Sequence, residues 1–361
     1  MKHLSLLLLL SLVACKKTTT PDQPLVEDTS TITSWKQDAH GIRFNAATNS
    51  VVYSKADANG VFHIYSSNTD GSNETAITYS GWPNDRHQWV EEIDPTGQFL
   101  ICYVEKTDYV TETDHTRSQG DAIPGYGAYT DIWLLKRDGS QAWMLLQTNN
   151  DYSDGVIHGA LSPDGTRFAW SQRVKAPVSG SLSEGAGCYD LKIADISYGS
   201  SPALSNIQSF RPGNVMALGE VESISNDNSN FLFYSSYETN SLISTPVYRM
   251  DIASGTITKL TTESFAQCPT YTPDGSHILY MTGQDCDIFP LSVQGADWWI
   301  MNYDGSNKRR ITWMNKKNSS QCQNAYRLAG VACFDTDSTF YGDVLTNPFG
   351  LSGYSVKVVI H

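Results

Sequence analysis

The segment Leu161-Ser-Pro-Asp-Gly-Thr-Arg-Phe-Ala-Trp170 has the same pattern as Tyr271-Thr-Pro-Asp-Gly-Ser-His-Ile-Leu-Tyr280. In both, a Pro-Asp-Gly turn joins a short strand to an apolar strand. Proline at the first central turn position fixes φ, and glycine accepts a positive φ, so each segment predicts a tight hairpin. Ile93-Asp-Pro-Thr-Gly-Gln-Phe-Leu-Ile-Cys102 is a close variant, and weaker copies begin at Phe44, Ile224 and Cys333.

A second pattern follows the first along the chain. It consists of an apolar strand, an Asp-Gly or Ser-Gly turn and another strand, as in Ile132-Trp-Leu-Leu-Lys-Arg-Asp-Gly-Ser140 and Trp299-Ile-Met-Asn-Tyr-Asp-Gly-Ser-Asn307, and again at 64–73 and 247–255. Asp-Gly between alternating strands is the strongest short hairpin signal. Each repeat unit therefore predicts four antiparallel strands, named A to D in chain order.

Six copies of this unit predict an all-β chain that forms a single six-bladed β-propeller, because one blade cannot bury both of its faces alone. Seven blades is the alternative if a long insertion hides a repeat. The two patterns together resemble the WD-like repeat of the TolB-like β-propeller family, over residues 31–361. The last copy contains only three strands and ends at His361. Residues 31–36 are expected to supply its fourth strand and to close the ring by pairing the two terminal strands, which removes an exposed edge.

The N-terminus has the features of an export signal. Lys2 precedes an apolar run from Leu4 to Val13, which is too short to span a membrane, and Ala14 precedes Cys15. Leu-Val-Ala-Cys resembles the lipobox of bacterial lipoproteins. This resemblance implies a signal peptide over residues 1–14, lipidation of Cys15 and a disordered tether over residues 15–30. The expected location is the bacterial cell envelope, with a lipid anchor in the outer membrane that faces the periplasm or the cell surface.

Composition excludes some partners and leaves others open. The formal net charge of −13 argues against nucleic acid, since phosphate binding requires an excess of Lys and Arg. The six cysteines after Cys15 would lie in an oxidising compartment, where an even number suggests disulfides. Cys268, Cys286 and Cys322 are expected on the same side of one blade, and we predict that two of them pair. The domain is expected to be a monomer.

Loop lengths predict a functional face. The A–B and C–D turns are uniformly short, whereas the B–C and D–A connections contain nearly all of the extra length. The long segments are 105–129, 173–187, 283–297 and 312–327. In a propeller these two sets of loops lie on opposite rims, and loops on a rigid scaffold commonly carry binding.

Candidate ligand residues lie near that rim or on the A strands that line the central channel. They are His87, Trp89, Glu92, His158, Glu220, Gln267 and Asp285. Glu91 and Glu222 occupy the same channel strands. Because neighbours in a strand point to opposite faces, Glu91 and Glu92 are not expected to act as a pair.

Two functions fit these observations. The first is a membrane-anchored envelope binding or scaffold protein that uses its elaborated loop face to bind a protein or glycan partner. The second is a propeller-type polysaccharide lyase or hydrolase, since oligogalacturonate lyases have related repeats and gather several histidines around a metal. That alternative would require His40, His87 and His158 to converge. No catalytic residue, cofactor or metal site is assigned from the sequence, and the binding role is preferred over an enzymatic one.

Overall fold

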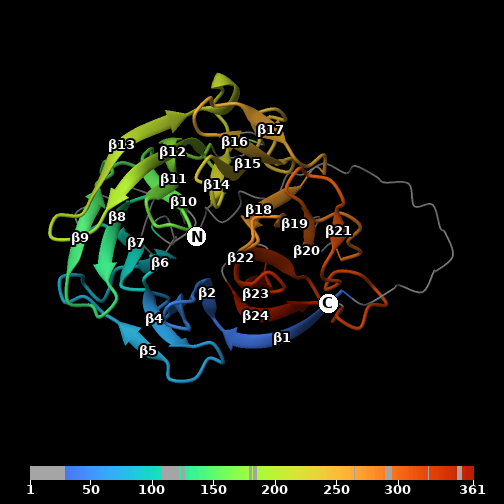
Figure 1. The fold of residues 1–361 in the computed structure, drawn as a ribbon, viewed down its shortest axis with the longest axis horizontal. Helices are drawn as coiled ribbons and strands as arrows, with labels where there is room; N and C mark the ends of the chain where they lie inside the picture. The colour runs from blue at the N-terminus through green and yellow to red at the C-terminus, as the bar shows by residue number, and fades with distance from the viewer. Residues whose placement is uncertain are drawn as a thin grey trace, which may run out of the picture.

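The computed structural model describes residues 29–107, 122, 127–178, 181, 185–263, 265–288, 295–323, 325–347 and 352–361. In this part of the chain, strands β1–β24 form six sheets of four antiparallel strands each. The sheets are arranged radially as the blades of a propeller, with one innermost strand from each blade around the central axis (Figure 1). The prediction of six blades is confirmed.

Consecutive strands build the first five blades from the inside outward. Blade 1 contains β2 (Ala39–Asn45), β3 (Ser50–Ala56), β4 (Phe62–Asn68) and β5 (Thr75–Ile77). Blade 2 contains β6 (Gln88–Ile93), β7 (Phe99–Glu105), β8 (Thr130–Lys136) and β9 (Ala142–Leu146). Blade 3 contains β10 (Gly155–Leu161), β11 (Arg167–Lys175), β12 (Cys188–Ser197) and β13 (Ala203–Phe210). Blade 4 contains β14 (Gly219–Ile224), β15 (Asn230–Ser235), β16 (Val247–Asp251) and β17 (Ile257–Lys259). Blade 5 contains β18 (Ala266–Tyr271), β19 (His277–Thr282), β20 (Asp297–Asn302) and β21 (Arg309–Arg310).

Blade 6 is shared by the two ends of the folded domain. It contains β22 (Leu328–Thr336), β23 (Thr339–Leu345), β24 (Gly353–Ile360) and, as its outermost strand, β1 (Ser30–Gln37). Thr31 lies opposite Val359 in the antiparallel ladder between β1 and β24. The expected closure of the ring is therefore confirmed, and β1 covers the edge that β24 would otherwise expose.

The turns form as their residue types predict. Gly97, Gly165 and Gly275, each the glycine of a Pro-Asp-Gly or Pro-Thr-Gly turn, have φ values of 72°, 74° and 71°. In the blade 3 turn the Gly165 N–H donates to the Ser162 carbonyl at 2.8 Å. A positive φ is what glycine adopts without steric cost, so the turn is specified by its own sequence.

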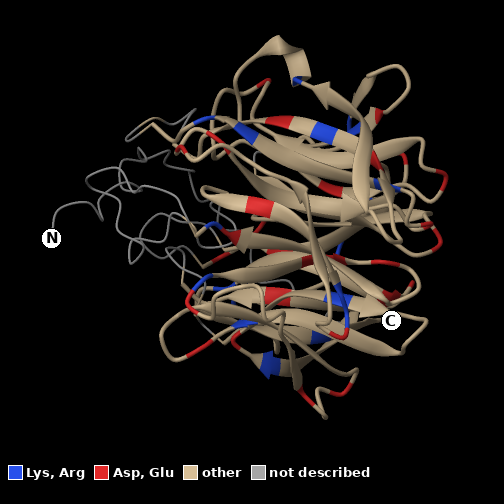
Figure 2. Cartoon of the chain, turned by 90° about the vertical axis from the view of Figure 1, so that its left-hand side faces the viewer, with Lys and Arg blue, Asp and Glu red and all other residues tan. Residues whose placement is uncertain are grey.

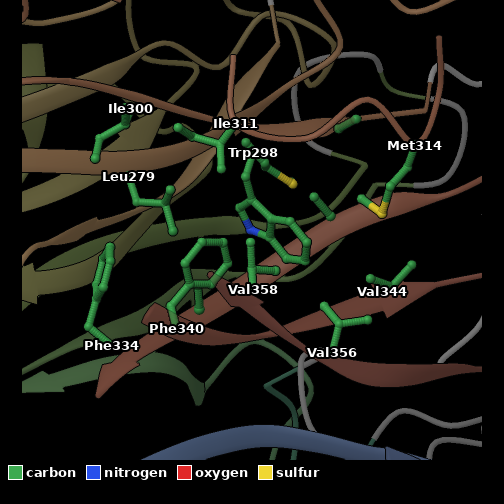
Figure 3. Close-up of a cluster of buried hydrophobic side chains, with 14 residues drawn as sticks. Leu279, Trp298, Ile300, Ile311, Met314, Phe334, Phe340, Val344, Val356 and Val358 are labelled. Atoms are coloured by element: carbon green, nitrogen blue, oxygen red, sulfur yellow. The ribbon is translucent and has the colours of Figure 1, made fainter. Parts of the chain in front are cut away.

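The hydrophobic core lies between neighbouring blades. Between blades 5 and 6, the buried Trp298 of β20 packs against Phe340 of β23, with ring centroids 5.2 Å apart (Figure 3). Leu279 and Ile300 contribute from blade 5, and Val358 contributes from blade 6. Each blade thus buries both faces of its sheet against its neighbours, which explains why second strands such as β7 and β15 are buried along nearly their whole length.

The two rims differ as expected. No more than six residues separate consecutive strands at any A–B or C–D turn, whereas 24 residues separate β7 from β8 and 17 separate β21 from β22. We call the side that carries the B–C and D–A connections the elaborated rim and the opposite side the plain rim. In the side view of Figure 2, the C-terminus of β24 marks the plain rim.

The signal peptide of residues 1–14, the lipidation site at Cys15 and the tether up to residue 28 lie outside the described residues. Within the described part of the chain, no helix has both the length and the apolar character required to cross a membrane.

Candidate functional site

The innermost strands share an irregularity that shapes the channel. In every blade the register between strands A and B shifts near the middle of strand A, for example between Val90 and Glu92, between Ile157 and Gly159, and between Val221 and Ser223. Such a bulge inserts an extra residue into one strand and redirects its side chain. The bulged residues are Glu91 in blade 2, His158 in blade 3 and Glu222 in blade 4.

The bulge in blade 2 changes the expected roles of Glu91 and Glu92. Instead of pointing to opposite faces, both carboxylates approach the same guanidinium group. Arg43 Nη2 lies 3.7 Å from Glu91 Oε1, and Arg43 Nε lies 3.4 Å from Glu92 Oε1. The expectation that the two side chains point to opposite faces was wrong, because the bulge interrupts the alternation of an ideal strand. Arg43, on β2, was not among the residues selected from the sequence.

The bulges in blades 3 and 4 bring together a histidine and two glutamates. His158 Nε2 lies 3.2 Å from Glu220 Oε2, and His158 Nδ1 lies 3.6 Å from Glu222 Oε1. The backbone of His158 has a φ of 39°, in the left-handed region that a non-glycine residue rarely adopts. Tyr234 on β15 donates its hydroxyl hydrogen to Glu220. We call His158, Glu220 and Glu222 the channel cluster.

Burial and mutual charge perturb the acid–base properties of these groups. Burial alone would lower the pKa of His158, but the carboxylates of Glu222 and Glu220 outweigh it and raise the pKa to about 9. Burial raises the pKa of Glu222 to about 8, against the attraction of His158. Burial also raises the pKa of Glu92 to about 7, with Arg43 acting in the opposite direction. Such perturbed groups in one channel are typical of functional sites.

The other sequence candidates are not part of this cluster. His87 is buried, and its Nδ1 accepts the Phe62 N–H at 3.2 Å. Trp89 packs edge-on against the ring of Phe62 at 5.4 Å, as part of the contact between blades 1 and 2. Gln267 donates to Thr245 Oγ1 at 3.1 Å. These three residues have structural partners that account for their positions.

Asp285 lies exposed in the connection between β19 and β20, on the elaborated rim. The backbone carbonyl of Asp285 accepts a hydrogen bond from Arg310 Nη1 at 3.3 Å.

The three-histidine site that the lyase alternative requires is not formed among the described residues. His40 lies next to Asp343, with Nδ1 and Oδ2 4.0 Å apart, and His87 contacts Phe62. The one group of His, Cys, Asp and Glu side chains in the described chain that has metal-binding spacing is the channel cluster. It combines His158 and Glu220, both selected from the sequence, with Glu222.

The disulfide predicted between two of Cys268, Cys286 and Cys322 is not formed in the structure, where these three described cysteines are free thiols. Cys286 is buried, and its thiol lies 3.6 Å from both Asp297 Oδ2 and Arg310 Nη2. Cys268 lies on the channel strand β18. Cys268 and Cys286 belong to blade 5, whereas Cys322 lies in the connection from β21 to β22, which leads into blade 6.

The elaborated rim exposes apolar side chains. Among the described residues, the exposed large hydrophobic residues on this rim are Val178, Val215, Met216 and Ile243. Their loops adjoin one another. A Cβ atom at Gly185 would lie 3.2 Å from the Leu242 side chain, and one at Gly213 would lie 3.0 Å from the Tyr237 ring. The connections above blades 3 and 4 therefore form one continuous part of the rim.

No family model and no curated protein matches the sequence. Solved structures do match in fold. The putative TolB from Agrobacterium tumefaciens aligns with a TM-score of 0.51 and 12% identity, over 92% of this chain and 98% of that one. A puromycin-hydrolysing peptidase from Mycobacterium tuberculosis aligns with a TM-score of 0.51 and 9% identity, over 89% of this chain and 51% of that one.

TolB from Acinetobacter baumannii aligns with a TM-score of 0.46 and 14% identity, over 92% of this chain, and the chain spans 64% of that protein's length. Identities this low show a shared fold and leave the activity open. The chain is a six-bladed β-propeller that structurally resembles the propellers of TolB and of a peptidase.

Proposed function

We propose that this chain is an envelope binding protein that docks a protein partner on its elaborated rim, above blades 3 and 4. The observation that carries the proposal is the exposure of Val178, Val215, Met216 and Ile243, between 39% and 48% of each residue, in adjoining loops of one rim. Exposed apolar groups that gather in one region commonly mark protein interaction sites.

The chemistry of these side chains favours a protein over a glycan. Aliphatic groups such as Val215 and Ile243 gain free energy when a partner removes them from water, and they offer nothing to sugar hydroxyls. The rigid blades beneath hold the loops in place, which lowers the entropy cost of binding. A glycan partner is the competing outcome of the experiments below.

The first experiment maps contacts with a photo-crosslinking amino acid in cells that produce the full chain. The probe replaces Met216 or Ile243 on the elaborated rim, and Gln98 or Gln141, which are exposed on the plain rim, as controls. We expect a discrete protein adduct from the elaborated-rim positions alone. Equal adducts from both rims, or adducts from the plain rim alone, would contradict the proposal.

The second experiment compares two exposed isoleucines. Ile243→Ser removes an apolar group from the proposed surface, whereas Ile207→Ser removes one of similar exposure from the outermost strand β13. Binding of the crosslinked partner should weaken about tenfold for the first variant, equivalent to about 1.4 kcal/mol, and should not change for the second. Equal loss in both variants would contradict a rim-specific contact, and recovery of glycan in place of protein would support the competing partner.

The anchoring of this binding protein rests on Cys15, and we propose that it is lipidated. In the full chain, Cys15→Ser should abolish incorporation of a labelled fatty acid and move the protein out of the membrane fraction. The lipid anchor would be contradicted if Cys15→Ser stayed in the membrane fraction and the unaltered chain incorporated no labelled fatty acid.

A further inference from the structure

The channel cluster contains a buried oxygen that has no hydrogen bond. Glu222 Oε1 finds no donor within the described residues, although the Glu222 side chain is only 6% exposed. A buried carboxyl oxygen without a hydrogen bond calls for an explanation, because most buried polar atoms have at least one such partner. The Nδ1 atom of His158 lies 3.6 Å from Glu222 Oε1.

Carboxyl groups outnumber basic side chains on the strands that surround this oxygen. The channel strands contribute four glutamates, and the described basic side chains among them are Arg43, which lies within 4 Å of Glu91 and Glu92, and the imidazoles of His40 and His158. Glu220 and Glu222 thus share only the imidazole of His158. A bound cation would neutralise this excess where water is largely excluded.

The donor set selects the kind of cation. One imidazole nitrogen and two carboxylate oxygens suit zinc or manganese, whereas calcium takes six to eight oxygen ligands. One ligand atom from each residue lies within 4.8 Å of the other two. Around an ion with bonds of about 2.1 Å, ligand atoms lie roughly 3 to 4 Å apart, so small side-chain rotations are sufficient.

The surroundings hold these side chains in place. The bulge turns His158 toward Glu220 and Glu222 from a neighbouring blade, and the Tyr234 hydroxyl fixes one oxygen of Glu220. Outer hydrogen bonds of this kind orient metal ligands in known sites. The strands β10 and β14 both begin on the elaborated rim, and the His158 side chain between them is 23% exposed.

We propose that His158, Glu220 and Glu222 bind one divalent transition-metal ion, of the zinc or manganese class, inside the propeller channel. The site has three protein ligands and leaves at least one coordination position open. It uses one histidine and two glutamates from two adjacent blades. The inference does not depend on the binding role proposed for the rim.

The test is titration calorimetry on the full chain after removal of metals with a chelator. Zinc chloride, manganese chloride and calcium chloride are added separately. We expect one equivalent of zinc or manganese to bind and calcium to bind far more weakly. Glu222→Gln and His158→Asn should each weaken binding by more than about tenfold, since even the loss of an outer-shell partner has an effect of that size.

Two control variants separate this site from adventitious binding. His63→Asn removes a histidine that pairs with Asp57 at the β3–β4 connection of blade 1, at 3.6 Å, and should leave the dissociation constant unchanged. Cys268→Ser removes a channel thiol outside the cluster and should do the same. The proposal would be overturned if the unaltered chain bound no metal, or if binding were lost in Cys268→Ser but kept in His158→Asn. It would also be overturned if His63→Asn weakened binding as much as His158→Asn does.

A second readout guards against misfolded variants. Metal that binds only the native state raises the thermal unfolding midpoint. Zinc should raise the unfolding midpoint of the unaltered chain, and it should not raise the midpoint of Glu222→Gln. Without metal, the midpoint of Glu222→Gln should be equal to or higher than that of the unaltered chain. If Glu222→Gln does not fold, the visible absorption of bound cobalt(II) is compared between the unaltered chain and Glu220→Gln. Identical cobalt spectra would overturn the proposal.

Discussion

Trp35, on the first strand, packs edge-on against Tyr341 of β23, with ring centroids 5.4 Å apart. The same indole lies 5.5 Å from the ring of Tyr53 in blade 1, and its Nε1 donates to the Thr69 carbonyl at 2.9 Å. One side chain therefore joins the closing strand both to the last blade and to the first.

Replacing Trp35 should weaken the closure of the ring. We expect Trp35→Ala to lower the free energy of unfolding by about 3 kcal/mol, because it removes two aromatic contacts and a hydrogen bond. Trp35→Phe keeps a ring in place and should cost about 1 kcal/mol. Equilibrium urea unfolding followed by fluorescence measures both values. Similar stability in all three proteins would mean that β1 contributes little to closure.

The buried ion pair of blade 5 gives a second prediction. Asp297 accepts hydrogen bonds from Arg310 and from the Met314 N–H, at 2.5 Å and 2.7 Å, and both charged residues are almost fully buried. Asp297→Ala should cost about 3 to 5 kcal/mol because it leaves a buried guanidinium unpaired.

The matched control for this pair is Asp85→Ala. Asp85 lies 2.9 Å from Arg86, but its side chain is 69% exposed. Surface pairs contribute about 1 kcal/mol or less, so this substitution should hardly change stability in the same urea experiment. Equal losses for the two variants would contradict the distinction between buried and exposed pairs.

Glu92 predicts a dependence of stability on pH. Burial raises its pKa in the folded chain from 4.5 to about 7. Between these values the native state holds a proton that the unfolded state has lost, so the free energy of unfolding falls as the pH rises from 4.5 to about 7. Above pH 7 both states are ionised at this residue, and its contribution to the slope ends.

The variant Glu92→Gln should remove this component of the slope when unfolding is measured at a series of pH values. Glu74 provides the control, because Lys36, Lys55 and Tyr53 lower its pKa to about 2 against the effect of burial. Its contribution to stability is lost only as the pH falls below about 4.5, so Glu74→Gln should leave the slope between pH 5 and 7 unchanged. An unaltered slope in Glu92→Gln would rule out a raised pKa for Glu92.

The thiols give a fourth prediction. Among the described residues Cys268, Cys286 and Cys322 form no disulfide, and burial raises the pKa of Cys102 and Cys286, which keeps both thiols protonated. Alkylation of the unfolded chain without reductant should modify all six cysteines that follow Cys15, and alkylation of the folded chain should modify the buried Cys102, Cys188 and Cys286 slowest. Mass spectrometry counts the labels. Two unlabelled cysteines in the unfolded chain would instead establish the disulfide that the sequence suggests.

The sequence by itself determined the propeller, the number of blades, the closure by the terminal strands and the difference between the two rims. These features follow from short-range chemistry. Proline and glycine specify the turns, short apolar runs specify the buried strands, and the spacing between turns specifies the loop lengths. His158 and Glu220 could be selected because they lie on strands that had to line the channel.

Only the tertiary structure decided which channel residues meet. The approach of Arg43 to both Glu91 and Glu92 depends on a bulge, and a bulge is a property of the register between two strands, which no single segment encodes. The meeting of His158 with Glu220 and Glu222 requires bulges in two blades and the contact between those blades. For the same reason, the position of a cysteine within a blade did not reveal whether its thiol could reach a second one.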